Sequence, residues 1–278
     1  MKGRINYLDV MAERPAFHAF DRSKDILDLV EHEVEMRPAR ESASGEGLDE
    51  RGFAIVRWPT AVDDFEDAVA VRTIYIAEVE ALLRQLTGAA KVVVTPNAVV
   101  RWGERSDRVV PAAANRPARF VHTDYTDESA LMWRDRMLPP EEAEARRGGR
   151  FAIYNIWRTL TPPPLDVALA VCDARSIAPE DLVAADAVAD FPDRDAMSFE
   201  AGIFRPSAAH RWYHVADIRT DEVLVFKGYD SDPARACRSA HTAFDNRDCP
   251  PDAPARRSVD IRAFAFFDGN HLSEEQGS

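Results

Sequence analysis

His122 and Asp124 are separated by one residue, at the point where the β-prone run ARFVH gives way to a loop. In an extended chain, side chains two residues apart point to the same side, so this imidazole and this carboxylate can reach one metal ion. Two such ligands and a distant histidine form the facial triad of non-haem iron oxygenases, which leaves coordination positions for 2-oxoglutarate and O₂. The spacing alone is weak support, because seven histidines and 48 acidic residues give roughly one such pair by chance.

The third ligand must come from a histidine far along the chain. His241, in SAHTAF, lies shortly before the Pro-rich turn that leads into the last β-prone run. His210 and His214 flank RWY in an extended stretch and compete for this role. Choosing His214 would leave the run DEVLVFKGY between the ligand and the arginines of the last run, so the order of segments favours His241. We therefore predict that His122, Asp124 and His241 are the metal ligands and the catalytic centre.

Two arginines near the end of the chain are candidates for binding 2-oxoglutarate, because a guanidinium pairs with a carboxylate through two hydrogen bonds. Arg257 opens the run SVDIRAFAFF, and Arg262 lies five residues further on. Strand alternation places them on opposite faces. We predict that Arg257 is the main anchor and keep Arg262 as its alternative. A surface arginine, or one paired with Asp260, is the competing interpretation for Arg257.

Other polar and aromatic residues complete the predicted site. Tyr125 follows the ligand aspartate and could bind a carboxylate, and Asn155 could join it in cofactor binding. Asn155 and Trp157 share one face of the run RFAIYNIW, and Arg158 points to the other. We assign Arg101, Trp157 and Arg158 to substrate binding, although a tryptophan in a strand is more often a core residue.

The segments that must position these residues are mostly β-prone. Short runs separated by Pro, Asp and Gly predict a barrel or jelly roll. They are KVVV, AVVRW, ARFVH, RFAIYNIW, VALAVCD, HRWYHVADI, DEVLVFKGY and SVDIRAFAFF. Residues 127–150 are rich in Glu, Arg and Ala and predict a helical insertion directly after Asp124, where it could cover the mouth of a barrel.

The first third of the chain has a different character. We expect an N-terminal arm with a short helix near residues 26–34, then a strand at FAIVRW, so that residues 1–60 hold the arm and the first strand. A flanking helix is predicted within residues 61–90, because apolar residues recur at helical spacing before Gly88. They are Val71, Tyr75, Val79, Leu82 and Leu86. With a jelly-roll core over residues 91–267, we expect residues 1–278 to form one domain.

Composition excludes several classes of partner. A net charge of -13 repels nucleic-acid phosphates. Three cysteines without CxxC spacing argue against a disulfide scaffold and fit a reducing cytoplasm. The N-terminus carries charges before any apolar run of signal-peptide length, and no stretch is apolar enough to span a membrane. We expect a cytoplasmic protein with no nucleic-acid or membrane partner, and the sequence leaves its oligomeric state open.

Several segments together resemble the CmcJ/AsaB-like hydroxylase and desaturase family. They are VHTDYT, YNIWRTL, ALAVCDARSI, DEVLVFKGYDSD, AHTAF and RRSVDIRAF, and they span roughly residues 92–267. The resemblance implies a double-stranded β-helix, dependence on Fe(II) and 2-oxoglutarate, and substrates drawn mostly from secondary metabolism. It matches His122 and Asp124 to the ligand pair, His241 to the HTAF histidine and Arg257 to the arginine that opens the last strand. One departure is NIWRTL, where the family commonly has a proline after the arginine.

The sequence therefore predicts a non-haem iron, 2-oxoglutarate-dependent dioxygenase of mainly β fold with flanking helices. It would hydroxylate, desaturate or oxidatively cyclise a small secondary-metabolite-like molecule with O₂. Two alternatives remain open at this point. One is a cupin-like hydrolase or isomerase that uses the same ligands without an oxidative cosubstrate. The other is a catalytically silent barrel that acts as a binding partner in a pathway complex.

Overall fold

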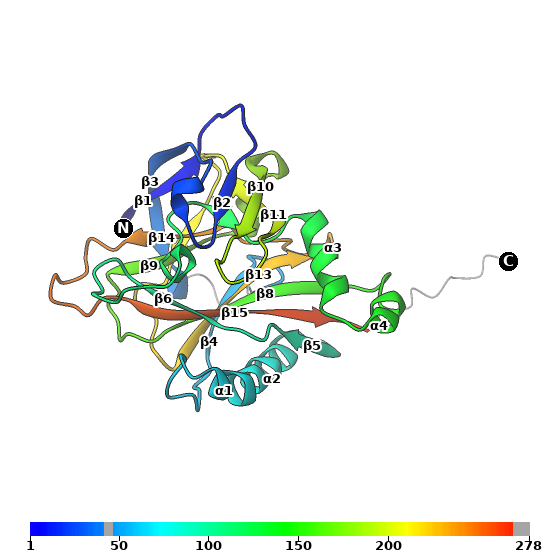
Figure 1. Cartoon of the computed structure of the whole chain (residues 1–278). Coiled ribbons are helices and arrows are strands. Elements are labelled where there is room, and N and C mark those ends of the chain that lie inside the picture. The colour runs from blue at the N-terminus through cyan, green and yellow to red at the C-terminus, as the bar shows by residue number, and fades with distance from the viewer. Residues whose placement is uncertain (42–46, 269–278) are drawn as a thin grey trace.

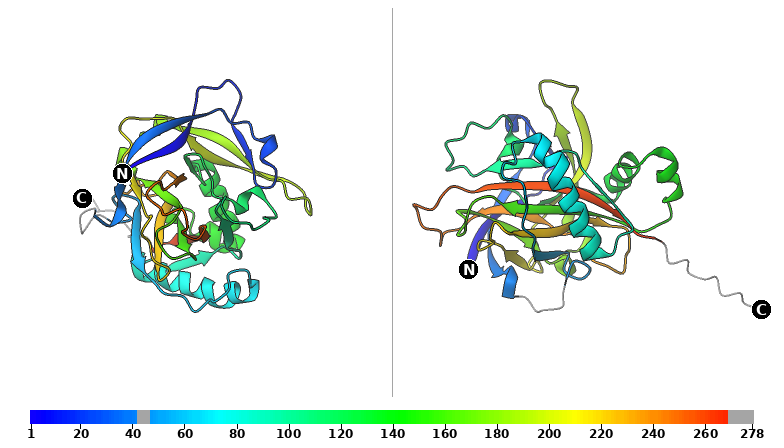
Figure 2. Two further views of the ribbon diagram at one scale, coloured as in Figure 1. Left: turned by 90° about the vertical axis from the view of Figure 1, so that its left-hand side faces the viewer. Right: turned by 90° about the horizontal axis from the view of Figure 1, so that it is seen from below.

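Two β-sheets form most of the molecule and lie face to face (Figures 1 and 2). The computed structural model describes residues 1–41 and 47–268. The larger sheet has nine strands, in the spatial order β1-β3-β12-β9-β14-β7-β11-β10-β2. Its strands are β1 (Lys2–Leu8), β2 (Ala16–His18), β3 (Leu29–Pro38), β7 (His122–Thr123), β9 (Val167–Cys172), β10 (Leu182–Ala189), β11 (Met197–Phe204), β12 (Trp212–His214) and β14 (His241–Asp245).

The smaller sheet has six strands and places β8 at its centre, between β13 and β15. Every residue of β8 is buried, as expected for a strand covered on both faces. β4 and β5 lie at the two ends, and β6 pairs with the first half of β15. The strands are β4 (Phe53–Arg57), β5 (Lys91–Val94), β6 (Val99–Trp102), β8 (Phe151–Thr159), β13 (Glu222–Asp230) and β15 (Arg257–Phe266).

Apolar side chains from both sheets meet between them and form a shared core. Trp157, Leu224 and Phe226 of the smaller sheet pack with Leu169 and Val171 of the larger one. Side chains on the inner faces of two packed sheets fill the space between them in this way in sandwiches and jelly rolls. The structure therefore confirms the predicted mainly β jelly roll with flanking helices.

A helical segment covers the outer face of the smaller sheet (Figure 1). It comprises α1 (Ala68–Ala70), a π-helical turn (Val71–Tyr75) and α2 (Ile76–Thr87). Asp67 caps its start by accepting hydrogen bonds from two backbone N–H groups, and Gly88 ends it in the left-handed conformation with φ of 70°. The predicted apolar stripe is buried at Val71, Tyr75, Val79 and Leu82, whereas Leu86 stays exposed.

The N-terminal segment is where the expected arm and helix were wrong. β1 pairs along its whole length with residues 29–35 of β3 at one edge of the larger sheet, and β2 pairs with β10 at the other edge. The segment LVEHEVEMRP alternates between exposed and more buried residues, with Glu31, Glu33 and Glu35 on the outer face. This is the period of a strand rather than of a helix, so the expected helix at residues 26–34 is contradicted.

Besides β1, β2 and β3, three further strands escaped the sequence analysis, and all three border the site. β10 is an alanine-rich stretch, β11 follows it as its hairpin partner, and β14 is a short strand that carries His241. The predicted insertion at residues 127–150 contains α3 (Asp127–Arg136) and α4 (Pro140–Ala145), with Thr126 and Ser129 forming a capping box at the start of α3. The short 3₁₀ turns are η1 (Arg22–Lys24), η2 (Ala39–Glu41), η4 (Ala113–Asn115), η5 (Ala174–Ser176) and η6 (Pro179–Asp181).

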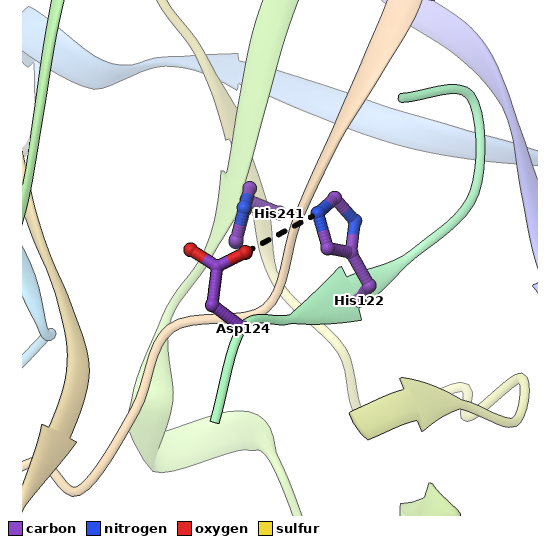
Figure 3. A group of neighbouring side chains, drawn as sticks. All are labelled: His122, Asp124 and His241. Carbon is purple, nitrogen blue, oxygen red and sulfur yellow. Dashed lines mark ion pairs between the residues drawn. The ribbon is translucent and has the colours of Figure 1, made fainter. Parts of the chain in front are cut away.

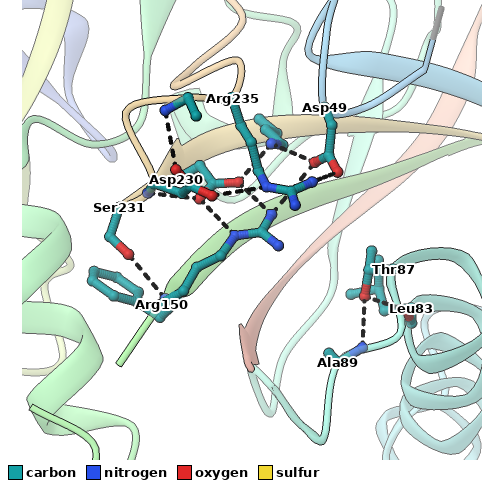
Figure 4. Close-up of polar contacts among 12 residues, drawn as sticks. Asp49, Leu83, Thr87, Ala89, Arg150, Asp230, Ser231 and Arg235 are labelled. Carbon is teal, nitrogen blue, oxygen red and sulfur yellow. Dashed lines mark hydrogen bonds and ion pairs between the residues drawn. The ribbon is translucent and has the colours of Figure 1, made fainter. Parts of the chain in front are cut away.

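An ionic network fastens β8 and β13 to the segment that precedes β4 (Figure 4). The ammonium of Lys227, which is fully buried, donates to Asp230 at 2.5 Å and to Asp49 at 2.9 Å. Arg150 donates to both carboxylate oxygens of Asp230, at 3.1 and 2.8 Å. Arg235 pairs with Asp49 from the outside. Each buried charge of this network therefore meets an opposite charge.

Among the described residues, no helix is long and apolar enough to cross a membrane.

Candidate active site

Pairing between β7 and β14 brings the two predicted histidine ligands together (Figure 3). His122 and His241 are directly opposite in the antiparallel register, so their side chains point to the same side. Their ring centroids are 4.2 Å apart. On the other edge of β7, Gly202 of β11 allows a close approach, because a Cβ atom there would lie 2.8 Å from a methyl carbon of Thr123.

Asp124 completes a three-residue group that could hold a metal ion. One ligand atom each from His122, Asp124 and His241 lie within 4.8 Å of one another, and Nε2 of His122 is 4.0 Å from Oδ1 of Asp124. Nδ1 of His122 donates to the carbonyl of Phe120 at 2.9 Å, and Nδ1 of His241 to the carbonyl of Ser239 at 3.4 Å. A carbonyl can only accept, so each Nε2 keeps its lone pair, as a metal-binding imidazole requires.

Burial and charge set the protonation states of the same group. Burial lowers the pKa of both histidines, and the neighbouring His122 helps to lower that of His241 to about 3. Both imidazoles are therefore neutral near pH 7. Burial opposes ionisation of Asp124, but Arg262 and the two histidines outweigh it and lower the pKa of that carboxyl. Two neutral imidazoles and one carboxylate are the donor set of a non-haem Fe(II) site, so the residues present fit this ion.

A series of ion pairs binds Asp124 through its second carboxylate oxygen, Oδ2. Nε of Arg262 lies 2.9 Å from Oδ2 of Asp124, and the same guanidinium reaches Asp260 at 3.4 Å. Asp260 in turn accepts from Nε of Arg101 at 2.6 Å. Arg101 lines the cavity wall as predicted, but it also donates to the backbone carbonyl of Ala114, so much of its guanidinium is already bound within the protein.

An inner cavity with an empty volume of about 420 Å³, the space at its mouth included, adjoins the three-residue group. Asn155 and Trp157 line it from β8, as their shared strand face predicts. Both polar atoms of the Asn155 amide and the indole nitrogen of Trp157 are buried without a hydrogen-bond partner in the described part of the chain. Buried polar atoms are normally paired, and those that are not are often the places where a ligand binds.

The cavity also contains Arg256, which the sequence analysis did not select. Its side chain is 2% exposed, and its guanidinium lies over the Trp157 ring at 5.1 Å. It donates to the hydroxyl of Ser258 and, weakly, to the carbonyl of Val167, but within residues 1–41 and 47–268 no carboxylate lies within ion-pair distance of it. Burial, and then the nearby Arg101, lower the pKa of this guanidinium to about 9.

The structure places Arg257 outside this cavity. Its guanidinium lies over the ring of Trp102 at 4.7 Å and faces Asp64 and Glu66 on the outer side of the sheet. Alternation along β15 explains the difference, since Arg256 and Arg262 are six residues apart and share the inner face that Arg257 does not. The two consecutive arginines at the start of the last run were visible in the sequence. The sequence did not show which of the two side chains points into the cavity.

The remaining predicted residues have other surroundings. Arg158 is buried on the opposite face, where it donates to the backbone carbonyls of Thr220 and Trp58. Tyr125 is buried beside Phe264 and lines a second, outer cavity. His210 binds Tyr7 and Asp181, and His214 packs edge-on against Phe244, so neither joins the three-residue group.

The outer cavity opens above His122, Asp124 and Arg262 and has an empty volume of about 1220 Å³, its mouth included. Its walls are mostly apolar and come from β2, β10, β11, α3 and the turn at η4. A cavity of this kind next to a group of titratable residues is where a small molecule binds in most enzymes. Fold and site together thus have the form of a non-haem iron oxygenase, with two cavities beside the three-residue group.

Comparison with known proteins agrees with this class. Residues 5–266 match a family model described as an oxidoreductase/YMDC permease-like domain. The chain is 33% identical over 240 residues to the Fe(II)/2-oxoglutarate-dependent dioxygenase nvfI of Aspergillus novofumigatus, covering 84% of this chain and 83% of that protein. It is 31% identical over 237 residues to the hydroxylase/desaturase CTB9 of Cercospora beticola, covering 80% and 72%.

A solved structure is similar over nearly the whole chain. The iron and alpha-ketoglutarate-dependent endoperoxidase NvfI superposes with a TM-score of 0.85 at 29% identity, covering 97% of this chain and 98% of that one. The chain belongs to the hydroxylase/desaturase family of Fe(II)/2-oxoglutarate-dependent oxygenases. It is an Fe(II)- and 2-oxoglutarate-dependent dioxygenase that oxidises a small molecule with O₂. This excludes the two alternatives, a hydrolase or isomerase and a catalytically silent barrel.

Proposed function

We propose that His122, Asp124 and His241 hold the Fe(II) ion and that Arg256 binds the distal carboxylate of 2-oxoglutarate. The observation that carries this assignment is the buried guanidinium of Arg256 beside the three-residue group, with no carboxylate opposite it in the described residues. Arg257, which we expected to be the anchor, faces Asp64 and Glu66 instead.

Charge balance explains why a dianion suits this cavity. A buried cation without a counter-ion is costly, and its pKa falls in consequence, as that of Arg256 does. A carboxylate entering the cavity supplies the missing charge and pairs with the guanidinium through charge-assisted hydrogen bonds. Arg262 already has Asp124 and Asp260 as partners, so it is less suited to this role.

Asn155 and Trp157 add hydrogen-bonding groups on the same wall. Their buried amide and indole N–H groups have no partner of their own in the described residues, and both residues line the cavity with Arg256. An oxygen-rich cosubstrate would satisfy them, whereas an empty or apolar cavity leaves them unpaired. We therefore assign Asn155 and Trp157 to 2-oxoglutarate binding, and Tyr125 to the wall of the outer cavity.

When bound, Fe(II) with 2-oxoglutarate and O₂ supplies an oxidation that converts 2-oxoglutarate to succinate and CO₂ and oxidises a C–H bond of the substrate. The chain's own residues fix where this happens. Arg262 orients the carboxylate of Asp124 through Nε at 2.9 Å. The apolar walls of the outer cavity hold the substrate against the metal side of the site and keep water out.

We further propose that the chain works as one domain in a reducing cytoplasm, without nucleic-acid or membrane partners. The three cysteines carry no disulfide, and a net charge of -13 opposes binding to nucleic acids and anionic membranes. The substrate would be a secondary-metabolite-like molecule. Whether the product is hydroxylated, desaturated or cyclised depends on which C–H bond the outer cavity presents.

The assignment is tested by titrating the protein anaerobically with Fe(II) and then 2-oxoglutarate. We expect one iron per chain, a visible charge-transfer absorption once 2-oxoglutarate chelates the metal, and slow release of succinate after O₂ is admitted. Binding of iron without this absorption would contradict the proposed cosubstrate site, and failure to bind iron would contradict the ligand assignment.

A further inference from the structure

The outer cavity has one cation that the proposed reaction does not use. Four arginines and three aspartates line the two cavities: Arg22, Arg101, Arg256 and Arg262, with Asp25, Asp124 and Asp260. In a chain with a net charge of -13, these cavities are therefore places where positive charge is in excess.

Arg22 has no direct ion pair in the described residues, although the carboxylate of Asp25 attracts it from a longer distance. Arg101 pairs with Asp260, and Arg262 pairs with Asp124. Asp25 accepts from the backbone N–H of His18 at 2.7 Å and lies 3.4 Å from its ring. Arg256 is assigned to 2-oxoglutarate. Arg22 has two long hydrogen bonds to backbone carbonyls, each 3.4 Å, and no ion pair within the described residues.

The position of Arg22 separates it from the metal. Arg101 and Arg262 line both cavities, whereas Arg22 lines the outer one alone and is exposed at its mouth. It is carried by η1, which Asp21 caps by accepting from the backbone N–H of Ser23. The segment just before η1 is bound to the turn at η4, because the backbone N–H of Ala114 donates to the carbonyl of Ala19 at 2.7 Å.

The remainder of the cavity is apolar. Phe17, Phe120, Val188 and Phe199 supply much of its wall. Trp133 of α3 packs edge-on against Phe199 with ring centroids 5.6 Å apart, and its buried indole N–H has no partner in residues 1–41 and 47–268. A ligand that fits this wall has a mainly apolar body and oxygen acceptors at few points.

We propose that Arg22 recognises an acidic group at the end of the substrate remote from the metal, so that the substrate class is an apolar small molecule carrying a carboxylate or similar acidic oxygen. This inference rests on the proposed function, because the metal side of the cavity defines which end reacts. It gives the N-terminal segment, which pairs with β10 and reaches the η4 turn, a place in substrate selection.

The test uses two fluorescent probes with the same arylaminonaphthalene body. 8-Anilinonaphthalene-1-sulfonate carries an acidic group, and N-phenyl-1-naphthylamine is neutral. Each is titrated into the protein loaded anaerobically with Fe(II) and 2-oxoglutarate. We expect Arg22→Gln to weaken the sulfonate probe about threefold to fivefold, the size of a partly exposed charge pair, and to leave the neutral probe unchanged.

Two further variants locate the effect. Arg72→Gln removes an exposed arginine from the helical segment on the far side of the smaller sheet and should change neither probe. Ala114→Trp places a bulky side chain on the partly exposed wall of the outer cavity and should weaken both.

The inference is overturned if Arg22→Gln leaves the affinity for the sulfonate unchanged or lowers both affinities equally. It is also overturned if Ala114→Trp affects neither probe, since the probes would then bind elsewhere. Failure of the proposed function is seen separately, as absence of the charge-transfer absorption in the wild-type protein before any probe is added.

Discussion

Two buried polar regions of this molecule differ in how completely their charges are paired. In the network of Lys227, Asp230 and Arg150, every buried charge meets an opposite one (Figure 4). In the inner cavity, Arg256 has no carboxylate opposite it, and Asn155 has no hydrogen-bond partner in the described residues. A protein surrounds its structural charges with its own partners, whereas it leaves binding groups unpaired for a ligand that arrives later.

The contrast gives a rule for separating stability from function in this chain. Changes in the network should cost folding free energy and leave ligand binding unchanged. Changes in the cavity should cost ligand binding and leave folding nearly unchanged, because the native state already bears the unpaired groups. The predictions that follow test this rule from its largest expected effect to its smallest.

The largest effect is expected at the proposed metal ligands. His241→Ala should abolish stoichiometric iron binding and succinate formation, because the facial group would lose one of its three donors. His214→Ala is the matched control, since His214 also lies in the larger sheet but outside the group. Iron retention is measured by anaerobic titration. Retention in His241→Ala together with loss in His214→Ala would reverse the assignment.

The network should give the largest change in stability. Asp230→Asn removes the buried carboxylate between Lys227 and Arg150 and leaves the half-exposed Asp49 as their shared partner, so it should lower the free energy of unfolding by about 3 kcal/mol. The same substitution at Asp221, a partly exposed carboxylate paired with Arg57 and Arg219 at the surface, should change much less. Urea unfolding measures both variants, and the iron affinity of Asp230→Asn should equal that of the wild type. A loss of iron binding there would break the proposed separation.

Arg256 should show the opposite pattern. Arg256→Met should raise the 2-oxoglutarate concentration required for half-maximal succinate formation about 100-fold, the size of a buried charge-assisted contact. Its stability should stay the same or rise, because a guanidinium without a counter-ion is replaced by an apolar chain. Arg257→Met is the control and should leave the 2-oxoglutarate requirement unchanged. If Arg257→Met has the larger effect, the facing of β15 assigned above is incorrect.

A smaller change in the cavity should again affect 2-oxoglutarate affinity without affecting the free energy of unfolding. Asn155→Leu removes two unpartnered buried atoms from the cavity wall. We expect about a tenfold weaker affinity for 2-oxoglutarate, with unfolding free energy unchanged or slightly increased. Calorimetric titration and urea unfolding measure the two on one sample. A large loss of stability would show that the Asn155 amide contributes to folding and is not an unpaired group available to a ligand.

Comparison of sequence and structure shows what a single chain can reveal about such sites. His122, Asp124 and His241 were predictable because spacing and segment order are one-dimensional properties. Arg256 was missed in favour of Arg257 because the choice depends on which face of β15 looks inward, and a shift of one residue reverses every side chain. β3 was mistaken for a helix although its glutamates alternate, because arms and edge strands carry weak apolar signals.

The outer cavity was the least predictable part for a related reason. Its wall combines β2, β10, β11 and α3, which lie far apart in the sequence. β10 has small residues such as Ala185 and Ala187 where a strand usually has larger ones, so its sequence signal is weak. Residues 15–25 show no apolar pattern that indicates their contact with this wall. Such a site is defined by tertiary contacts that no local pattern encodes.

The smallest expected effect concerns His210, a histidine whose hydrogen-bonding groups have partners within the protein. The side chain of His210 is 1% exposed, and its ring nitrogens are both occupied: one binds the hydroxyl of Tyr7 at 2.9 Å and the other lies 3.1 Å from Asp181. Burial lowers its pKa, although Asp181 opposes the shift. Well above pH 6.5 the ring is neutral in both folded and unfolded chains and adds nothing to the pH dependence of stability. As pH falls below 6.5, the unfolded chain takes up a proton that the folded chain resists, so stability decreases until pH reaches the lower folded pKa.

We therefore expect His210→Asn to flatten the dependence of unfolding free energy on pH by about 1 kcal/mol between pH 6.5 and 5.5. His32→Asn is the control, since this histidine lies in β3, next to the edge strand β1, is partly exposed and has no carboxylate within ion-pair distance in the described residues. Urea unfolding at several pH values measures both variants against the wild type. An unchanged slope in His210→Asn would mean that Asp181 compensates the burial of His210, and that a histidine with both nitrogens occupied adds nothing to the acid sensitivity of this fold.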